Sequence, residues 1–294
     1  MKRLRANFSQ NHLFALLAVW KLINATSDAI AKSQNMPLRR NYWKRYLNDL
    51  HMDGFLVSKL IHYTSPSGKG TQKLGEFFAL SAKGAEVIAE TLGTDPENVF
   101  FPHGGIQSKS PFQFPHRALL IQLLAMFLGH QKANPEAFEV LDLLPEYRYI
   151  GANRLGNGQK ATRVTVSGDF KENALIPDGI IRFRAGETVR LATVEFHRET
   201  DTGRIIEQLR KHASAIDQGL FSGMFDQQPA NHVLSVYDDS RRLRNVRDRI
   251  EAGEFPNFSR YSAGFHFASL DDVFNLGVDK AFYQLTGKKS EIFN

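Results

Sequence analysis

The spacing of apolar and polar positions predicts a β-hairpin followed by a helix at the centre of the chain. Two short apolar runs, residues 175–183 and 189–196, are separated by Arg-Ala-Gly-Glu. Short apolar runs that flank a few turn-forming residues are typical of two antiparallel strands. After a polar stretch, apolar residues recur at helical spacing through residues 203–216, which predicts an amphipathic helix.

The first 95 residues show a different pattern, in which predicted helices surround one predicted strand pair. Residues 11–24 and 38–52 have helical spacing, and capping residues indicate a short helix between them. Strands are expected at residues 55–63 and 76–80, around a basic, glycine-containing tip, and a further helix follows at 82–92. This order of elements resembles a winged helix-turn-helix, a module that binds duplex DNA in many proteins.

Basic residues are concentrated on two elements of this predicted module. The third helix carries four cations and the hairpin carries two more: Arg39, Arg40, Lys44, Arg45, Lys69 and Lys73. Exposed Lys and Arg side chains displace counterions from phosphates, so such a cluster favours a nucleic-acid partner. A small helical domain that contacts only other proteins is the alternative for residues 1–95.

Residues 96–115 are rich in Pro, Gly, Ser and His without periodicity, and we interpret them as a linker. Beyond the linker, residues 116–294 alternate predicted helices with predicted strands, among them an apolar strand at 232–237 and a short strand at 265–268. Such alternation is typical of a mixed α/β sheet. The sequence therefore predicts an α/β protein with two domains.

The helix predicted at residues 239–251 carries a row of arginines: Arg241, Arg242, Arg244, Arg247 and Arg249. The nearby acidic residues are fewer, so we expect these arginines to contact DNA rather than to form ion pairs. The whole chain has 37 Lys and Arg against 31 Asp and Glu, which gives a net charge of +6. This modest excess suits a polyanionic partner where the cations are clustered.

Composition excludes several kinds of chemistry. Cysteine is absent, which excludes disulfide bonds, thiolate metal sites and cysteine nucleophiles. Any metal would therefore be held by oxygen or imidazole ligands. No apolar run approaches the length of a membrane-spanning helix or forms a signal peptide, so we expect a cytoplasmic protein without a membrane partner.

Two acidic residues mark the central hairpin. Asp178 follows Pro177 at the start of the first strand, and Glu195 lies near the end of the second. Adjacent strands can bring these carboxylates together, where they could hold one divalent cation, Mn²⁺ or Mg²⁺. His197 shares a face with Glu195, because side chains alternate along a strand, and it is the third expected ligand. Ordinary surface residues at a turn and a strand end are the alternative.

Two further residues could join this group. Lys211, about two turns into the following helix, could point back toward the carboxylates. Glu146 precedes a predicted strand and is either a third carboxylate of the metal site or a solvated residue.

The order strand, Pro-Asp, strand, Glu and basic helix resembles the core of the PD-(D/E)xK nuclease superfamily. The position two residues after the Glu, where that superfamily has its lysine, holds His197, and Lys211 would replace the lysine. With the N-terminal module included, the order is similar to that of the plasmid replication-relaxation family over nearly the whole chain. The resemblance implies a restriction-endonuclease-like domain at residues 116–294, with Asp178 and Glu195 as metal ligands.

The resemblance also implies a function, a metal-dependent nuclease or relaxase that nicks or cleaves DNA at a plasmid or mobile-element site. The catalytic residues would be Asp178, Glu195, Lys211 and His197, and the imidazole ligand favours Mn²⁺ over Mg²⁺. The first alternative is a non-catalytic DNA-binding initiator or transcriptional regulator with a degenerate nuclease fold, and a weaker one is a partner-docking protein. Double-stranded DNA is the expected partner, while a homodimer and contacts with other mobilisation or replication proteins are left open.

Overall fold

A computed structural model describes residues 8–37, 41–64, 71–103, 105–106, 113–150, 159–198, 200–225 and 232–293. The described chain divides into two compact units, one up to Gly129 and the other from His130 onward. The long helix α5 (Gln113–Ala133) begins within the segment predicted as a linker, and its last turn belongs to the second unit. Among the described residues, no helix has the length and apolar character needed to cross a membrane.

The first unit contains the predicted order of helices and one hairpin. Its elements besides α5 are α1 (Gln10–Leu22), α2 (Ser27–Ser33), α3 (Tyr42–Met52), β1 (Leu56–Thr64), β2 (Thr71–Leu80), α4 (Ala82–Leu92) and a short 3₁₀ turn, η1 (Pro96–Asn98). The strands β1 and β2 pair antiparallel, and Ala25 adds a single bridge to Phe78. Buried Leu16, Leu47 and Phe77 contribute to its core. A winged helix-turn-helix stays a prediction for this unit.

The start of α4 explains the sequence Leu-Ser-Ala-Lys-Gly. The hydroxyl of Ser81 accepts a hydrogen bond from the backbone N–H of Gly84 at 3.1 Å and so caps the helix. Gly84 also lies beside Phe55, just before the start of β1, where a Cβ would come 2.2 Å from the carbonyl oxygen of Phe55. Serine and glycine at these positions therefore allow the helix to begin directly against the strand.

The second unit is built on a mixed five-stranded sheet, which confirms the predicted α/β class. The strand order is β11-β10-β9-β8-β3. The strands β3 (Phe138–Pro145), β8 (Gly179–Ala185) and β9 (Thr188–His197) pair antiparallel, whereas β10 (His232–Tyr237) and β11 (Phe265–Ser269) continue the sheet in parallel from β9. The predicted central hairpin is confirmed, since β8 and β9 pair from Gly179–Val194 to Ala185–Thr188.

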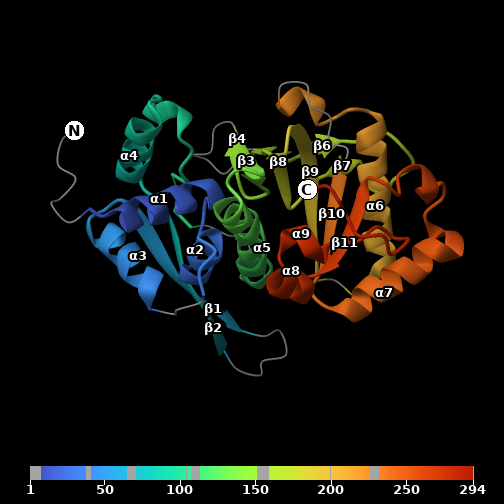
Figure 1. Ribbon diagram of the computed structural model, residues 1–294, viewed down its shortest axis with the longest axis horizontal. Helices are drawn as coiled ribbons and strands as arrows, with labels where there is room; N and C mark the ends of the chain where they lie inside the picture. Colours follow the sequence, from blue (N-terminus) through green and yellow to red (C-terminus); the bar gives the residue numbers. More distant parts are fainter. Residues whose placement is uncertain are drawn as a thin grey trace. The chain divides into compact units, whose positions relative to one another are not determined.

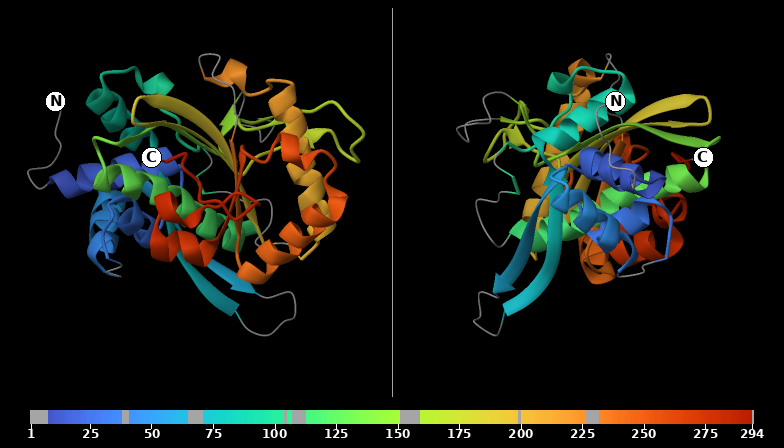
Figure 2. Two further views of the ribbon diagram at one scale, coloured as in Figure 1. Left: turned by 45° about the vertical axis from the view of Figure 1, so that its right-hand side comes forward. Right: turned by 90° about the vertical axis from the view of Figure 1, so that its left-hand side faces the viewer.

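Helices cover this sheet on both faces (Figure 1). On one face lie α6 (Thr202–Asp217) and α7 (Ser240–Arg249), which share an apolar core with β10 and β11. On the other lie α8 (Leu270–Leu276) and α9 (Val278–Ala281), followed by Phe282, whose ring packs against that of Phe293. Figure 2 shows the same layers from two more directions, with α6 and α7 along one side of the sheet.

Smaller elements complete the second unit near the start of β8. Two short strand pairs form there, β4 (Tyr149–Ile150) with β5 (Gln159–Lys160), and β6 (Val164–Thr165) with β7 (Ala174–Leu175). The remaining turns are η3 (Ser222–Met224), η4 (Ile250–Glu254) and η5 (Phe258–Arg260). The hydroxyl of Thr162, between the two strand pairs, donates to the carbonyl oxygen of Pro177 at 2.9 Å, which fixes this region against the residue that precedes Asp178.

Candidate functional site

Three polar residues of β9 face α6 across the interior of the second unit. Thr193, Glu195 and His197 alternate with apolar residues along the strand, so their side chains share one face of the sheet. All three are buried, and Glu195 is only 1% exposed. A buried carboxylate requires several hydrogen-bond donors around it. This burial does not agree with the alternative that Glu195 is an ordinary surface residue.

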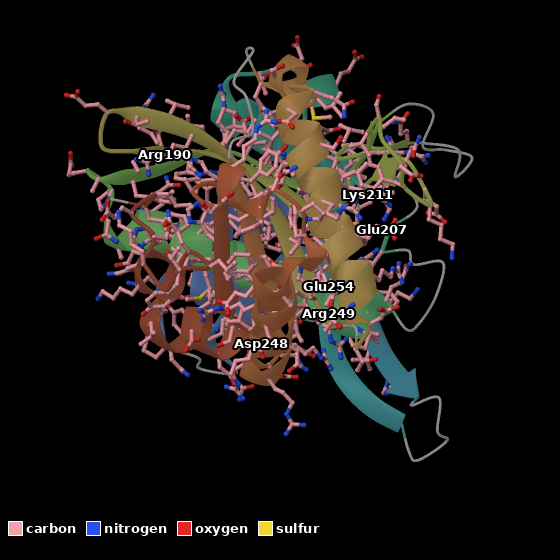
Figure 3. The ribbon with its side chains drawn as sticks, turned by 90° about the vertical axis from the view of Figure 1, so that its right-hand side faces the viewer. Arg190, Glu207, Lys211, Asp248, Arg249 and Glu254 are labelled. Atoms are coloured by element: carbon pink, nitrogen blue, oxygen red, sulfur yellow. The ribbon has the colours of Figure 1, made fainter. Side chains whose placement is uncertain are left out.

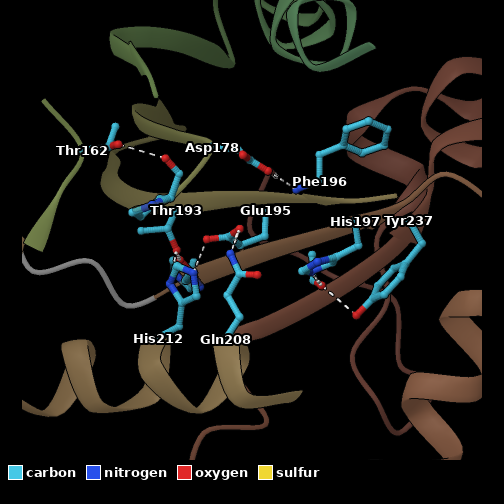
Figure 4. A network of polar contacts seen from close by, with 12 residues as sticks. Thr162, Asp178, Thr193, Glu195, Phe196, His197, Gln208, His212 and Tyr237 are labelled. Atoms are coloured by element: carbon cyan, nitrogen blue, oxygen red, sulfur yellow. Dashed lines mark hydrogen bonds and ion pairs between the residues drawn. The ribbon is translucent and has the colours of Figure 1, made fainter. Parts of the chain in front are cut away.

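Helix α6 supplies two of the donors (Figure 4). The side-chain amide of Gln208 donates to Oε2 of Glu195, and the Nε2 of His212 lies 2.5 Å from Oε1. Gln208 and His212 are four residues apart, so both project from the same side of the helix toward the strand. The second imidazole nitrogen of His212, Nδ1, lies 3.1 Å from the hydroxyl of Thr193.

The protonation of His212 follows from its surroundings. Burial, and then the nearby His197, lower the pKa of His212 to about 3, although Asp178 raises it. The imidazole is therefore neutral at pH 7 and has one N–H, which Nε2 donates to Glu195. Its Nδ1 then accepts a hydrogen bond from the Thr193 hydroxyl. Glu195 thus has a neutral donor on each of its two oxygens.

Asp178 lies where the sequence predicted, at the start of the hairpin. It directly precedes Gly179, which pairs with Val194, and its Oδ2 accepts a hydrogen bond from the backbone N–H of Phe196 at 2.7 Å. This bond holds the Asp178 carboxylate beside the strand position that follows Glu195 (Figure 4). The pairing of β8 with β9 places Asp178 and Glu195 on adjacent strands, as expected, and the binding of one cation by both carboxylates stays a prediction.

His197 is directed toward β10. Its Nε2 lies 3.0 Å from the hydroxyl of Ser235, and that hydroxyl donates to the Tyr237 oxygen at 2.9 Å. The rings of His197 and Tyr237 also pack at 4.9 Å between centroids. Burial raises the pKa of Tyr237, so this phenol keeps its proton. The contact with Ser235 gives His197 a role in the sheet interior, and its role as a metal ligand stays a prediction.

Lys211 is on α6 as predicted, but its ion pair is with Glu207 rather than with Glu195. The two groups lie 3.4 Å apart, and Figure 3 shows them next to each other on the helix. Both line a cleft of about 780 Å³ together with Gln208 and other residues from Lys171 to Ile176 and from Asp201 to Arg204. Gln208 therefore connects the cleft to the buried carboxylate of Glu195.

Sequence reasoning missed the two donors that α6 supplies. Gln208 and His212 could have been found from the predicted helix, because residues four apart share a face. The expectation of a helical lysine instead favoured Lys211, which is one position away from His212 and projects about 100° around the helix from it.

A second polar group adjoins Asp178 at the start of β8. The backbone N–H of Glu146 donates to the carbonyl oxygen of Asp178 at 2.8 Å. One carboxylate oxygen of Glu146 and one of Asp178 lie within 4.8 Å of each other. The ammonium of Lys160 on β5 is 2.7 Å from Oε2 of Glu146. Glu146 is thus partly buried and ion-paired rather than fully solvated.

The donor chemistry here fits a hard divalent cation. Asp178 and Glu195 offer carboxylate oxygens, and the separation between Glu146 and Asp178 is one that two ligands of a single cation can have. The imidazoles of His197 and His212 already make hydrogen bonds to Ser235, Thr193 and Glu195. The carboxylate oxygens are therefore better candidates for cation ligands than the two imidazoles.

The residues predicted to bind DNA in the first unit are only partly within the described chain. Arg39, Arg40 and Lys69 lie outside the described residues. Lys73 belongs to β2, while Arg45 is exposed and Lys44 half-buried on α3.

The arginine row of α7 corrects one expectation. Arg242 forms ion pairs with Asp238 and, at 3.5 Å, with Asp239. Arg249 pairs with Glu254, and Arg247 donates to the carbonyl oxygen of Leu285 at 2.9 Å. The prediction that the row avoids ion pairs is therefore wrong for Arg242 and Arg249, because acids just before and after the helix reach them. Arg241 and Arg244 are exposed.

Comparisons with known proteins add no family to this picture. No protein-family model, curated protein or solved structure matches the chain.

Proposed function

We propose that this protein is a metal-dependent DNA-cleaving phosphodiesterase, with its active site at Asp178 and Glu195. The observation that supports the proposal is the position of these two carboxylates at the start of β8 and on the adjacent β9, each held by fixed hydrogen-bond donors, with Gln208 also lining a cleft. Carboxylates held by fixed donors are typical of sites that bind a catalytic cation. The first unit would contribute duplex binding through α3 and its hairpin, in the manner of a winged helix.

Some residues of the site would bind the cation, and others hold those ligands in place. Asp178 and Glu195 would hold the cation, and when bound it would activate water and neutralise charge on the phosphate. The hydrogen bonds from Phe196, Gln208 and His212 fix the carboxylates in place. Hydrolysis forms a bond between the water oxygen and phosphorus and breaks one P–O ester bond. One proton of the water passes to solvent, and the departing oxygen takes up a proton.

A second function has its own support, namely that of a DNA-binding initiator or regulator in which this fold no longer cleaves. Both oxygens of Glu195 already accept hydrogen bonds, and the position of the superfamily's lysine holds His197, which contacts Ser235. In a plasmid or mobile element, either protein would serve replication or mobilisation. The two functions differ in metal uptake and in cleavage.

The test uses the full-length chain with supercoiled plasmid and either Mn²⁺ or Mg²⁺. We expect nicked or linear product with metal and none with a chelator. Asp178→Asn keeps an oxygen that can accept from Phe196 but removes the negative charge. It should lower the cleavage rate about 100-fold or more, because a catalytic metal contributes several kcal/mol to the transition state.

The matched control is Asp142→Asn, which removes the carboxylate of β3 that pairs with Arg182 at 2.6 Å. This variant should cleave like the wild type. If the wild type retards plasmid but neither binds Mn²⁺ in calorimetry nor cleaves at millimolar metal, the regulator function replaces the nuclease.

A further inference from the structure

Lys160 offers a cation beside the proposed active site. It belongs to β5, which pairs with β4, and the backbone N–H of the next residue, Ala161, donates to the carbonyl oxygen of Arg148 at 2.8 Å. Two residues after Lys160, the hydroxyl of Thr162 is fixed to the carbonyl oxygen of Pro177. The segment that carries Lys160 is therefore anchored directly to the chain that carries Asp178.

The ammonium of Lys160 is both positioned and accessible. It lies 2.7 Å from Oε2 of Glu146, and a carboxylate oxygen of Glu146 lies within 4.8 Å of one of Asp178. A lysine ammonium has three N–H donors, and the bond to Glu146 uses one of them. The side chain is 30% exposed, so an incoming anion can reach it.

Lys211 and His197 are less suited than Lys160 to contact an anion beside Asp178. The ion pair of Lys211 is with Glu207, in the cleft on α6. His197 is buried and directs its Nε2 toward Ser235. By contrast, Lys160 pairs with Glu146, which has a carboxylate oxygen within 4.8 Å of one of Asp178.

We propose that Lys160 is the catalytic cation of this site, contacting a non-bridging oxygen of the scissile phosphate. This inference rests on the proposed phosphodiesterase function. As water attacks phosphorus and the ester bond breaks, negative charge grows on the phosphate oxygens, and a fixed ammonium stabilises that charge. Lys160 keeps its proton throughout. Glu146 holds the ammonium in place and is a positioning residue.

The experiment compares Lys160→Met, Lys160→Arg and Lys211→Met in the full-length chain. Lys160→Met keeps the length of the side chain without its charge. It should lower the single-turnover cleavage rate about 100-fold, the usual effect of removing one charge-stabilising donor. Lys160→Arg should recover part of the rate, and Lys211→Met should stay within a few-fold of the wild type.

A second measurement does not depend on cleavage. Titration of each variant with Mn²⁺ alone should show that Lys160→Met binds the metal at least as tightly as the wild type, because the change removes a positive charge near Asp178. Lys211→Met should leave the Mn²⁺ affinity unchanged. Loss of Mn²⁺ binding in Lys160→Met would mean that the lysine organises the site, and the catalytic role would be overturned.

The outcomes separate this inference from the function on which it rests. If the wild type cleaves and Asp178→Asn does not, but Lys160→Met cleaves at the wild-type rate, Lys160 is not the catalytic cation and the phosphodiesterase stands. The same holds if Lys211→Met is the variant that loses activity. If the wild type does not cleave at all, both proposals fall.

Discussion

Single residues decide what the centre of the second unit can do, and Glu195 is the clearest case. A carboxylate that is 1% exposed is costly to bury, and it is retained here with donors from Gln208 and His212. Replacing Glu195 alone would leave these buried donors unpaired, whereas replacing Glu195, Gln208 and His212 together by apolar side chains of similar volume could be neutral or stabilising. The retention of the whole polar group where an apolar one could pack favours a functional role over a structural one.

The opposite face of the sheet carries a pair of histidines that makes folding sensitive to acid. The Nδ1 of His232 lies 3.1 Å from the Nε2 of His266. Burial, followed by charge from Arg190, lowers the pKa of His232 to about 4. Burial, followed by charge from His232 and Arg190, lowers the pKa of His266 to about 3. Both imidazoles are neutral in the native protein at neutral pH.

We therefore predict that stability falls on acidification from pH 6.5 toward pH 4. The unfolded chain binds protons on these histidines below about pH 6.5, whereas the folded chain does not, so protons favour unfolding. Each histidine should contribute a slope of about 1.4 kcal/mol per pH unit within that window. Urea unfolding at pH 7, 6 and 5 measures the slope, and His266→Asn should reduce it. An identical slope in this variant would assign the acid sensitivity to other groups, among them the buried His212, whose pKa is also lowered.

Elements were easier to predict than the site that they carry. The β8–β9 hairpin, α6 and β10 lie where the apolar pattern placed them, because β9 and β10 contain short, continuously buried runs and α6 buries one face. Spacing also placed Asp178 and Glu195 on adjacent strands, where the structure has them. Spacing could not reveal the contact of Lys160 with Glu146. Lys160 lies on β5, which pairs with β4, and strands of two residues each are too short to show periodicity. Nor did it show that Arg242 and Arg249 have acidic partners, because side-chain geometry decides ion pairs.

The arginines of α7 differ in exposure and pairing, and they should therefore differ in their effect on DNA binding. Arg241 and Arg244 are exposed, whereas Arg242 is held by Asp238 and Asp239. Replacing Arg241 and Arg244 by Ala should weaken duplex binding and reduce its salt dependence, if α7 contacts phosphates. Replacing Arg242 by Ala should change DNA affinity less, because its charge is already compensated. Fluorescence anisotropy with a labelled duplex compares the two variants, and equal affinity of both to the wild type would remove α7 from the DNA surface.

The excess of basic residues over the whole chain bears on how the protein would bind DNA. A net charge of +6 over 294 residues is too small to bind polyanions without local clustering. In the first unit the candidate cluster follows α3 and the hairpin, and in the second it follows α7. Among the predicted DNA contacts, Arg45, Arg241 and Arg244 are exposed, whereas Glu195 is buried, so we expect DNA affinity and cleavage to respond to different substitutions.

Salt dependence can test whether DNA affinity and cleavage respond to different substitutions. Binding of the full-length protein to a duplex should weaken steeply as salt rises, because each neutralised phosphate releases counterions. Lys44→Ala with Arg45→Ala on α3 should reduce the slope of log affinity against log salt by about one for each phosphate that the variant no longer neutralises, and Arg39→Ala with Arg40→Ala should act similarly. Asp178→Asn, measured without metal, should leave the slope unchanged and the affinity equal or higher, because it removes a negative charge from the surface that the phosphates approach. An unchanged slope in both basic-residue variants would move the DNA surface away from α3. A lower affinity in Asp178→Asn would show that binding and the proposed active site are not separable.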